Sequence, residues 1–255
     1  MSLLKTTEKR GIKLIEKVEG IIISETPYGE TSKIINILTK EYGIIGVMAK
    51  GAKSMKSKLR AATDRFTYGY FHIYYKPDKL STLITVDVIN SFKQIRSDIT
   101  LISYLNFIVE LTHQVYKQNG DPKLYQLCIQ AILKINDGLN PLIITNIIEL
   151  KYLAYLGVGL NLNACSLCGS KEKIITLSAD SGGYICQDCL TDEPIVDIKT
   201  IKMLRMYDLV EISSISKIDI SNQVQNEINI FINKYYERYT GLYLKSKKFL
   251  DSLLS

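Results

Sequence analysis

Residues 34–49 contain the pattern on which the fold prediction depends: Ile34-Ile-Asn-Ile-Leu-Thr39, then Lys40-Glu-Tyr-Gly43, then Ile44-Ile-Gly-Val-Met-Ala49. Two runs rich in β-branched residues flank a short stretch that ends in glycine, which is the pattern of a β-hairpin. Glycine tolerates the positive φ that such a turn needs at its end. These residues therefore predict two antiparallel strands, one at 34–39 and one at 44–49.

Three further runs on either side of this hairpin also read as strands, at 18–24, 66–75 and 80–89. The last two are separated by Lys76-Pro-Asp-Lys79, which has the composition of a turn. Five short strands with a helix-sized gap between the third and the fourth fit a small Greek-key barrel of the OB type. The spacing alone leaves an SH3-like barrel open as an alternative.

After residue 97 the apolar residues recur at intervals of three and four, which predicts helices. We expect these helices at about 99–118, 122–135, 141–156, 197–210 and 221–250. The fold class is therefore α+β with several domains. The domains are an OB-type five-stranded barrel over 1–97 and a helical bundle domain over 98–255, with a cysteine module inserted at 163–190. Residues 1–16 read as a disordered or non-native lead-in.

The cysteine module contains Cys165-Ser-Leu-Cys168 and Cys186-Gln-Asp-Cys189. Two residues between cysteines let both thiolates of a pair bind one ion, and four thiolates complete the tetrahedral shell of a structural zinc. We therefore expect one structural zinc ion per chain. An iron or iron–sulfur site is the alternative, since four thiolates also suit iron. Five cysteines without a secretion signal disfavour disulfides and indicate the cytoplasm.

The net charge of +6 is concentrated in the N-terminal part of the chain. Residues 1–100 hold 17 Lys and Arg against 10 Asp and Glu, whereas residues 101–255 hold 15 against 16. The centre of this positive charge is a run of five cations: Lys50, Lys53, Lys56, Lys58 and Arg60. Such a density favours a polyanionic partner, usually nucleic acid. The alternative is a solvated loop that only keeps the protein soluble.

Catalytic signatures are weak in this sequence. Of its two histidines, His72 lies among aromatic residues of a predicted strand and reads as a barrel residue, and His113 has no evident carboxylate partner. The acidic residues form no nuclease-like cluster. Residues 46–54 approach a phosphate-binding P-loop but have one residue too many before the lysine. No apolar run reaches the roughly 20 residues that a transmembrane helix needs. We therefore expect neither an enzyme nor a membrane protein, and no small-molecule substrate.

An ordered series of short motifs resembles the RecO family of bacterial DNA repair proteins, over residues 17–252. The N-terminal motifs are Gly20-Ile-Ile-Ile, Pro27-Tyr-Gly-Glu-Thr-Ser32, Leu38-Thr-Lys-Glu-Tyr-Gly43 and Ala49-Lys-Gly-Ala52. They are followed by Glu149-Leu-Lys-Tyr-Leu-Ala-Tyr-Leu-Gly157, the two cysteine pairs with Ser178-Ala-Asp-Ser-Gly-Gly183 between them, and Leu244-Lys-Ser-Lys-Lys-Phe-Leu250. One departure is Thr63-Asp64-Arg65-Phe66, where the family more often has an apolar residue followed by Gln-Pro-Phe.

The resemblance implies an OB barrel, a helical domain and a zinc module. It also implies a non-enzymatic mediator of recombination that binds single- and double-stranded DNA and anneals complementary strands in the bacterial cytoplasm, at the nucleoid. The implied partners are RecR, the C-terminal tail of single-stranded DNA-binding protein and, indirectly, RecA. We expect the tail to bind the near-neutral helical domain. An OB-fold zinc-ribbon RNA-binding or translation-associated protein is the alternative, and a zinc-containing nucleic-acid enzyme is a further one.

Phosphate contacts are expected from the five cations of the run: Lys50, Lys53, Lys56, Lys58 and Arg60. Lys33 and Arg65 are further candidates for DNA contacts. Tyrosines of the fourth strand could stack on bases, namely Tyr68, Tyr70, Tyr74 and Tyr75. About half of them should point into the barrel, because alternate residues of a strand face opposite sides.

Overall fold

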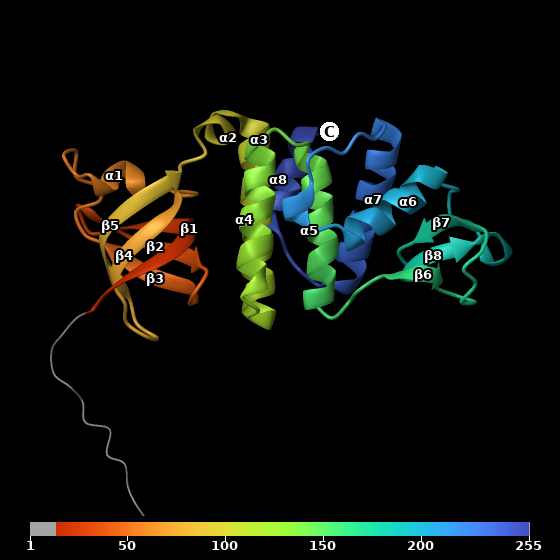
Figure 1. Ribbon diagram of the computed structural model, residues 1–255, viewed down its shortest axis with the longest axis horizontal. Helices are drawn as coiled ribbons and strands as arrows, with labels where there is room; N and C mark the ends of the chain where they lie inside the picture. Colours follow the sequence, from red (N-terminus) through yellow and green to blue (C-terminus); the bar gives the residue numbers. More distant parts are fainter. Residues whose placement is uncertain (1–13, 255) are drawn as a thin grey trace, which may run out of the picture. The chain divides into compact units, whose positions relative to one another are not determined.

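The computed structural model describes residues 14–254 (Figure 1). The chain divides into two compact units, and the boundary in the sequence falls between Ser91 and Phe92. The lead-in expected over residues 1–16 lies mostly outside the described residues, and Ile15 already begins the first strand. We call the two parts the barrel unit and the helical unit, and each is described by itself.

The barrel unit is a closed barrel of five strands in the order β1-β2-β3-β5-β4. The strands are β1 (Ile15–Tyr28), β2 (Ser32–Thr39), β3 (Gly43–Ala49), β4 (Tyr68–Tyr74) and β5 (Ser81–Asn90). β1 pairs with both β2 and β4, and a short parallel contact between β3 and β5 closes the barrel. This order confirms the OB-type prediction. A four-residue helix, α1 (Leu59–Ala62), occupies the expected gap between β3 and β4.

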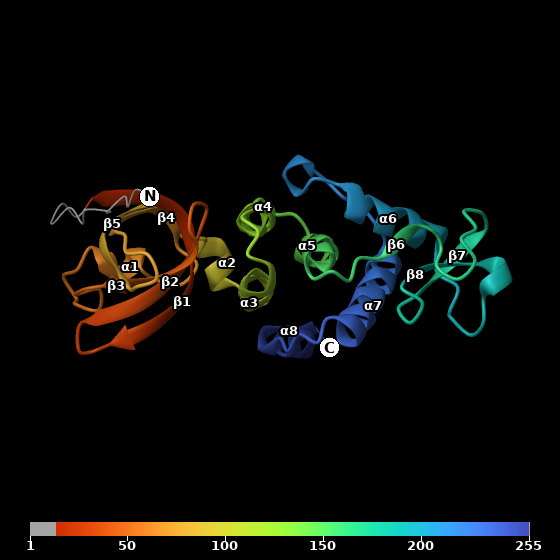
Figure 2. The same ribbon diagram turned by 90° about the horizontal axis from the view of Figure 1, so that it is seen from below.

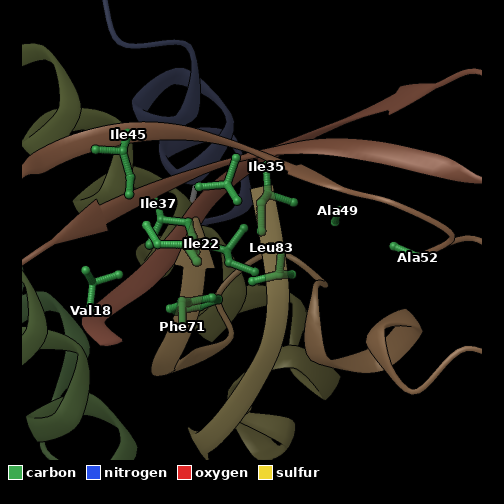
Figure 3. Close-up of a cluster of buried hydrophobic side chains, with 11 residues drawn as sticks. Val18, Ile22, Ile35, Ile37, Ile45, Ala49, Ala52, Phe71 and Leu83 are labelled. Carbon is green, nitrogen blue, oxygen red and sulfur yellow. The ribbon is translucent and has the colours of Figure 1, made fainter. Parts of the chain in front are cut away.

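The barrel interior is filled mainly by alternate residues of β2, β3 and β4, as the alternation of side chains along a strand predicts, with further residues from β1 and β5. Figure 3 shows this core, which includes Val18, Ile22, Ile35, Phe71 and Leu83. Two glycines allow the strands to approach closely. A Cβ atom on Gly69 would lie 2.4 Å from the backbone oxygen of Asp87, and one on Gly20 would lie 2.6 Å from the Ile37 side chain.

The helical unit has a core of amphipathic helices around one buried helix (Figures 1 and 2). The helices are α2 (Lys93–Ser97), α3 (Ile99–Asn119), α4 (Lys123–Asn136), α5 (Pro141–Tyr155), α6 (Ile198–Leu209), α7 (Asn222–Tyr239) and α8 (Lys245–Leu254). The Asn140 side chain caps α5, and Pro141 occupies its first position, as the sequence predicts. α5 is the buried helix, because every residue from 143 to 150 is shielded from solvent.

The prediction of one helix over 221–250 is wrong, because α7 ends at Tyr239 and α8 begins at Lys245. Gly241 adopts a φ of 61°, which a right-handed helix cannot accommodate. The second helix is then capped by a distant residue. The backbone N–H groups of Lys245 and Ser246 donate to the Glu110 carboxylate at 3.3 and 2.8 Å. The spacing of apolar residues along the sequence does not indicate such a break between two helices.

The cysteine module lies in the chain between α5 and α6, as an insertion in the helical unit. It has three short strands in the order β6-β8-β7: β6 (Asn161–Cys165), β7 (Ile174–Ser178) and β8 (Gly183–Cys186). A 3-10 turn over Gln187–Cys189 follows β8. Within residues 14–254, no helix has both the length and the apolar character needed to cross a lipid bilayer.

Candidate nucleic-acid interface and metal centre

The four cysteines of the inserted module converge on one point. Cys165 and Cys186 stand at the ends of β6 and β8, and Cys168 and Cys189 lie in the turns that follow. Their sulfur atoms all lie within 4.8 Å of one another, and the Cys168 and Cys186 sulfurs are 3.6 Å apart. Such a cluster can hold a metal ion.

Local backbone geometry explains why the first cysteine pair folds into a tight turn. Gly169 adopts a φ of 76°, and its N–H donates to the Cys165 carbonyl at 2.9 Å. The Cys165 N–H donates in turn to the Ser170 carbonyl at 2.7 Å. Gly183 lets β6 and β8 approach, because a Cβ atom there would lie 2.3 Å from the backbone oxygen of Asn161. Gly169 therefore serves the turn, and Gly183 serves the strand contact.

The electrostatics of the cluster favour a cation among the sulfurs. Burial opposes ionisation of Cys165, but hydrogen bonds from the backbone N–H groups of Cys168 and Cys186 outweigh it and lower the pKa of the thiol to about 6. Interactions with the Cys168 and Cys186 sulfurs raise the pKa of Cys189 to about 12. A bound cation would offset the mutual repulsion of four thiolates at this point. The donor set fits a soft divalent ion bound tetrahedrally.

The run of cations between β3 and β4 is exposed but held in place; we call residues 50–60 the basic segment. All five of its cations lie at the surface: Lys50, Lys53, Lys56, Lys58 and Arg60. The segment is anchored by Ala52, which is fully buried in the barrel core. The Lys53 N–H also donates to the Thr31 carbonyl at 2.7 Å. These two contacts fix the position of the basic segment on the barrel.

Lys33 and Arg65 have different surroundings from the basic segment. Lys33 is buried, and its ammonium group lies 2.6 Å from the Glu25 carboxylate and 3.2 Å from that of Asp64. The Arg65 Nε donates to the Ile23 carbonyl at 2.9 Å, and its guanidinium group lies over the Phe66 ring. Both side chains therefore fasten residues 64–66 to the barrel wall.

Three of the tyrosines predicted to stack on bases, Tyr68, Tyr70 and Tyr75, make contacts within the barrel unit. Tyr68 is buried, and its hydroxyl donates to the Glu19 carboxylate at 2.6 Å. Tyr70 is half-buried, with the Lys17 ammonium group 4.2 Å from its ring centre. Tyr75 stacks on Tyr42, with ring centres 4.1 Å apart. These three rings are occupied by contacts within the barrel.

A pair that the sequence did not indicate joins two strands on the barrel exterior. His72 on β4 and Asp87 on β5 approach to 2.8 Å, and the hydrogen bond from His72 lowers the pKa of the Asp87 carboxyl. The two residues are 15 positions apart, and only the β4–β5 register brings them together. The contact is an exterior cross-strand pair.

The helical unit carries a groove that the sequence could not locate, lined by apolar residues together with four acidic and two basic side chains. It has a volume of about 620 Å³ and lies between α7 and the cysteine module. Ile230 and Phe231 of α7 contribute apolar surface, and Lys234 stands on the same helix. Some of its carboxylates are already engaged. Asp180 pairs with Arg238 at 2.6 Å, and other oxygens accept hydrogen bonds from neighbouring protein donors.

Comparison with known proteins matches both units. The profile described as "Recombination protein O N terminal" matches residues 14–92, and "Recombination protein O C terminal" matches residues 96–248. The DNA repair protein RecO of Bacillus velezensis is 37% identical over 246 residues, covering 95% of this chain and 96% of that protein. The RecO proteins of Listeria monocytogenes and Bacillus subtilis are 36% and 35% identical, with at least 94% of each chain covered. With both units matched, the chain belongs to the RecO family of DNA repair proteins.

Proposed function

We propose that this protein is a non-enzymatic mediator of homologous recombination. It binds single- and double-stranded DNA, anneals complementary strands and, with RecR, helps to place RecA on gaps covered by single-stranded DNA-binding protein. The observation that carries the proposal is the closed OB barrel whose β3–β4 connection presents five exposed cations. OB-fold proteins that bind single strands combine such positive charge, which follows the phosphate backbone, with aromatic side chains on which bases stack.

Annealing is chemically compatible with this surface. Two strands repel each other through their phosphates, and cations that neutralise the phosphates remove that barrier. The bases must keep their pairing edges free, so contact through phosphates suits the reaction better than contact through base edges. No covalent bond is formed or broken during annealing, and no nucleotide hydrolysis is needed.

Annealing provides the direct test of this proposal. Two complementary strands, one with a fluorophore and one with a quencher, should pair faster with the protein than without it, and ATP should make no difference. Strands coated with single-stranded DNA-binding protein should pair as well, and they should not if that protein lacks its tail. RNA strands of the same sequence form the control that separates a DNA mediator from an RNA-binding protein. Equal rates with and without the protein would contradict the proposal.

Replacing Lys53, Lys56 and Lys58 by alanine should weaken binding to every DNA sequence. Each phosphate contact contributes about 0.7 to the slope of log affinity against log salt on single strands, so the slope should fall by about two. The measurement is a titration of labelled single-stranded DNA at several salt concentrations. The matched control replaces three exposed lysines of the helical unit, Lys117, Lys171 and Lys199. Equal slopes for the two triple variants would mean that the basic segment does not contact phosphates.

We propose that the acidic tail of single-stranded DNA-binding protein docks in the groove beside α7. Its apolar end would fill the space beside Ile230 and Phe231, and Lys234 would face a carboxylate of the tail. A labelled tail peptide should therefore bind the full-length protein, and Lys234→Glu should weaken it several-fold, whereas Lys202→Glu should not. Saturating oligo(dT) should leave the peptide bound. Displacement by oligo(dT) would contradict the separation of DNA and tail sites.

We also propose that the ion held by the four cysteines is zinc, one per chain, with a structural role. Cys165, Cys168, Cys186 and Cys189 would complete its shell, which leaves no position for a reacting water. The ion would supply positive charge to balance the thiolates and would hold the cysteine module in its folded form.

A further inference from the structure

We propose that Tyr28 is the base-stacking residue of the DNA interface and that it sets the preference for single strands over duplex. This inference rests on the proposed function. Tyr28 lies at the end of β1, beside the turn to β2, and its side chain is 56% exposed. An exposed aromatic residue is not unusual by itself. What distinguishes Tyr28 is that the turn beside it is hydrogen-bonded to the basic segment.

Three hydrogen bonds fasten the β1–β2 turn to the basic segment. The Lys53 ammonium group donates to the Gly29 carbonyl at 3.2 Å, and the Lys53 N–H donates to the Thr31 carbonyl at 2.7 Å. The Gly51 N–H lies 3.3 Å from the Ser32 hydroxyl oxygen and donates to it. The residue directly after Tyr28 is therefore bonded to one of the proposed phosphate-binding lysines, and all of these groups belong to the barrel unit.

The basic segment also presents one exposed apolar side chain. Met55, in the middle of the basic segment, is 80% exposed, and its sulfur lies 2.6 Å from the Arg60 guanidinium group. Grooves for single strands commonly combine cations for the backbone with rings on which bases stack. Three of the tyrosines predicted to stack on bases, Tyr68, Tyr70 and Tyr75, make intramolecular contacts instead, as described above. Tyr28 is 56% exposed, and the turn that begins directly after it is hydrogen-bonded to the basic segment.

The two parts of this surface should respond to different features of DNA. Lysines contact phosphates, which single strands and duplexes both carry. A ring can stack only on a base whose face is not already covered by its neighbours in a duplex. Tyr28 therefore adds affinity for single strands alone, and that contribution is lost when annealing returns the base to a helix. Annealed product is then held by the cations only and dissociates more readily than the substrate.

The chain contains no tryptophan, so Tyr28→Trp creates a single fluorescent reporter. Its emission should be quenched when the variant binds oligo(dT), and much less when it binds an abasic strand of the same length. Tyr243→Trp, at a 59% exposed position in the helical unit, is the matched control and should not be quenched. Equal quenching by the normal and the abasic strand would overturn the stacking assignment.

Affinity measurements complete the test on the full-length protein. Tyr28→Ala should weaken single-strand binding by roughly 5- to 150-fold, the range expected for one stacked base, with an unchanged salt slope and unchanged affinity for blunt duplex. Tyr28→Phe should bind like the wild type, because stacking needs the ring and not the hydroxyl. If Tyr28→Ala binds single strands normally while the triple lysine variant does not, the inference fails and the proposed function stands. If the wild type binds no DNA, the proposed function fails.

Discussion

Cys168→Ser is expected to release the metal ion and to unfold the cysteine module, while the barrel unit stays folded. The segment from 161 to 189 has three short strands of four or five residues, too few to form an independent core. Metal binding supplies about 10–16 kcal/mol of folding free energy in small zinc peptides. Without the ion, the sulfurs that crowd Cys189 have no compensating charge, and the turns around them lose their common anchor.

Hydrogen exchange is the measurement that separates the module from the rest of the chain. In Cys168→Ser, amides of residues 161–189 should exchange much faster, and those of residues 15–90 should not change. Elemental analysis of wild-type protein purified without chelators should give about one zinc per chain. Cys128→Ala is the control for metal content, since Cys128 is buried in α4, away from the cluster. Wild-type protein without metal, or a variant with full protection over 161–189, would contradict the prediction.

Lys247→Met is expected to destabilise the helical unit by about 3–5 kcal/mol, because it leaves a buried carboxylate without its cation. Glu149 is 1% exposed in the centre of α5, and the Lys247 ammonium group of α8 lies 3.7 Å from it. The same ammonium group lies 4.9 Å from the Phe107 ring centre. Asp251 also approaches Lys247, at 3.8 Å, but it is largely exposed.

The pH dependence of this effect follows from the Glu149 carboxyl. Burial raises its pKa, and Lys247 partly offsets that rise. Removing Lys247 therefore raises the folded-state pKa further. A carboxyl with a raised folded-state pKa favours folding while it is protonated, and this advantage is lost as the pH rises through that pKa. The deficit of Lys247→Met should consequently be larger at about pH 8 than at about pH 5.

Urea unfolding followed by the helical circular-dichroism signal measures the deficit. Lys245→Met is the matched control, since Lys245 is exposed on the same helix and should give a change near zero. Adding Glu149→Gln to Lys247→Met should recover part of the loss, because the neutral amide removes the unpaired charge. A pH-independent deficit, or equal deficits for the two methionine variants, would show that the pair does not stabilise α8.

Patterns within short stretches were sufficient to predict much of this protein. The hairpin at 34–49, the helix at 141–156 and the four-cysteine cluster were all predicted from local spacing and are confirmed. In the hairpin and the helix, neighbours in the sequence interact through one turn or one period, so the information lies within a few residues. The two cysteine pairs lie 18 positions apart, and it is the spacing within each pair that indicated a shared ion. The order of motifs along the chain likewise indicated the family, which the comparisons confirm.

The tertiary structure alone decided which polar and aromatic side chains are exposed. Lys33 and Lys53 look alike in the sequence, yet one pairs with two carboxylates in the barrel wall and the other lies at the surface beside the β1–β2 turn. The buried Glu149 and the surroundings of Tyr28 also depend on partners brought together by packing. Spacing in the sequence does not encode these contacts, because residues far apart in the chain form them only when strands and helices pack together.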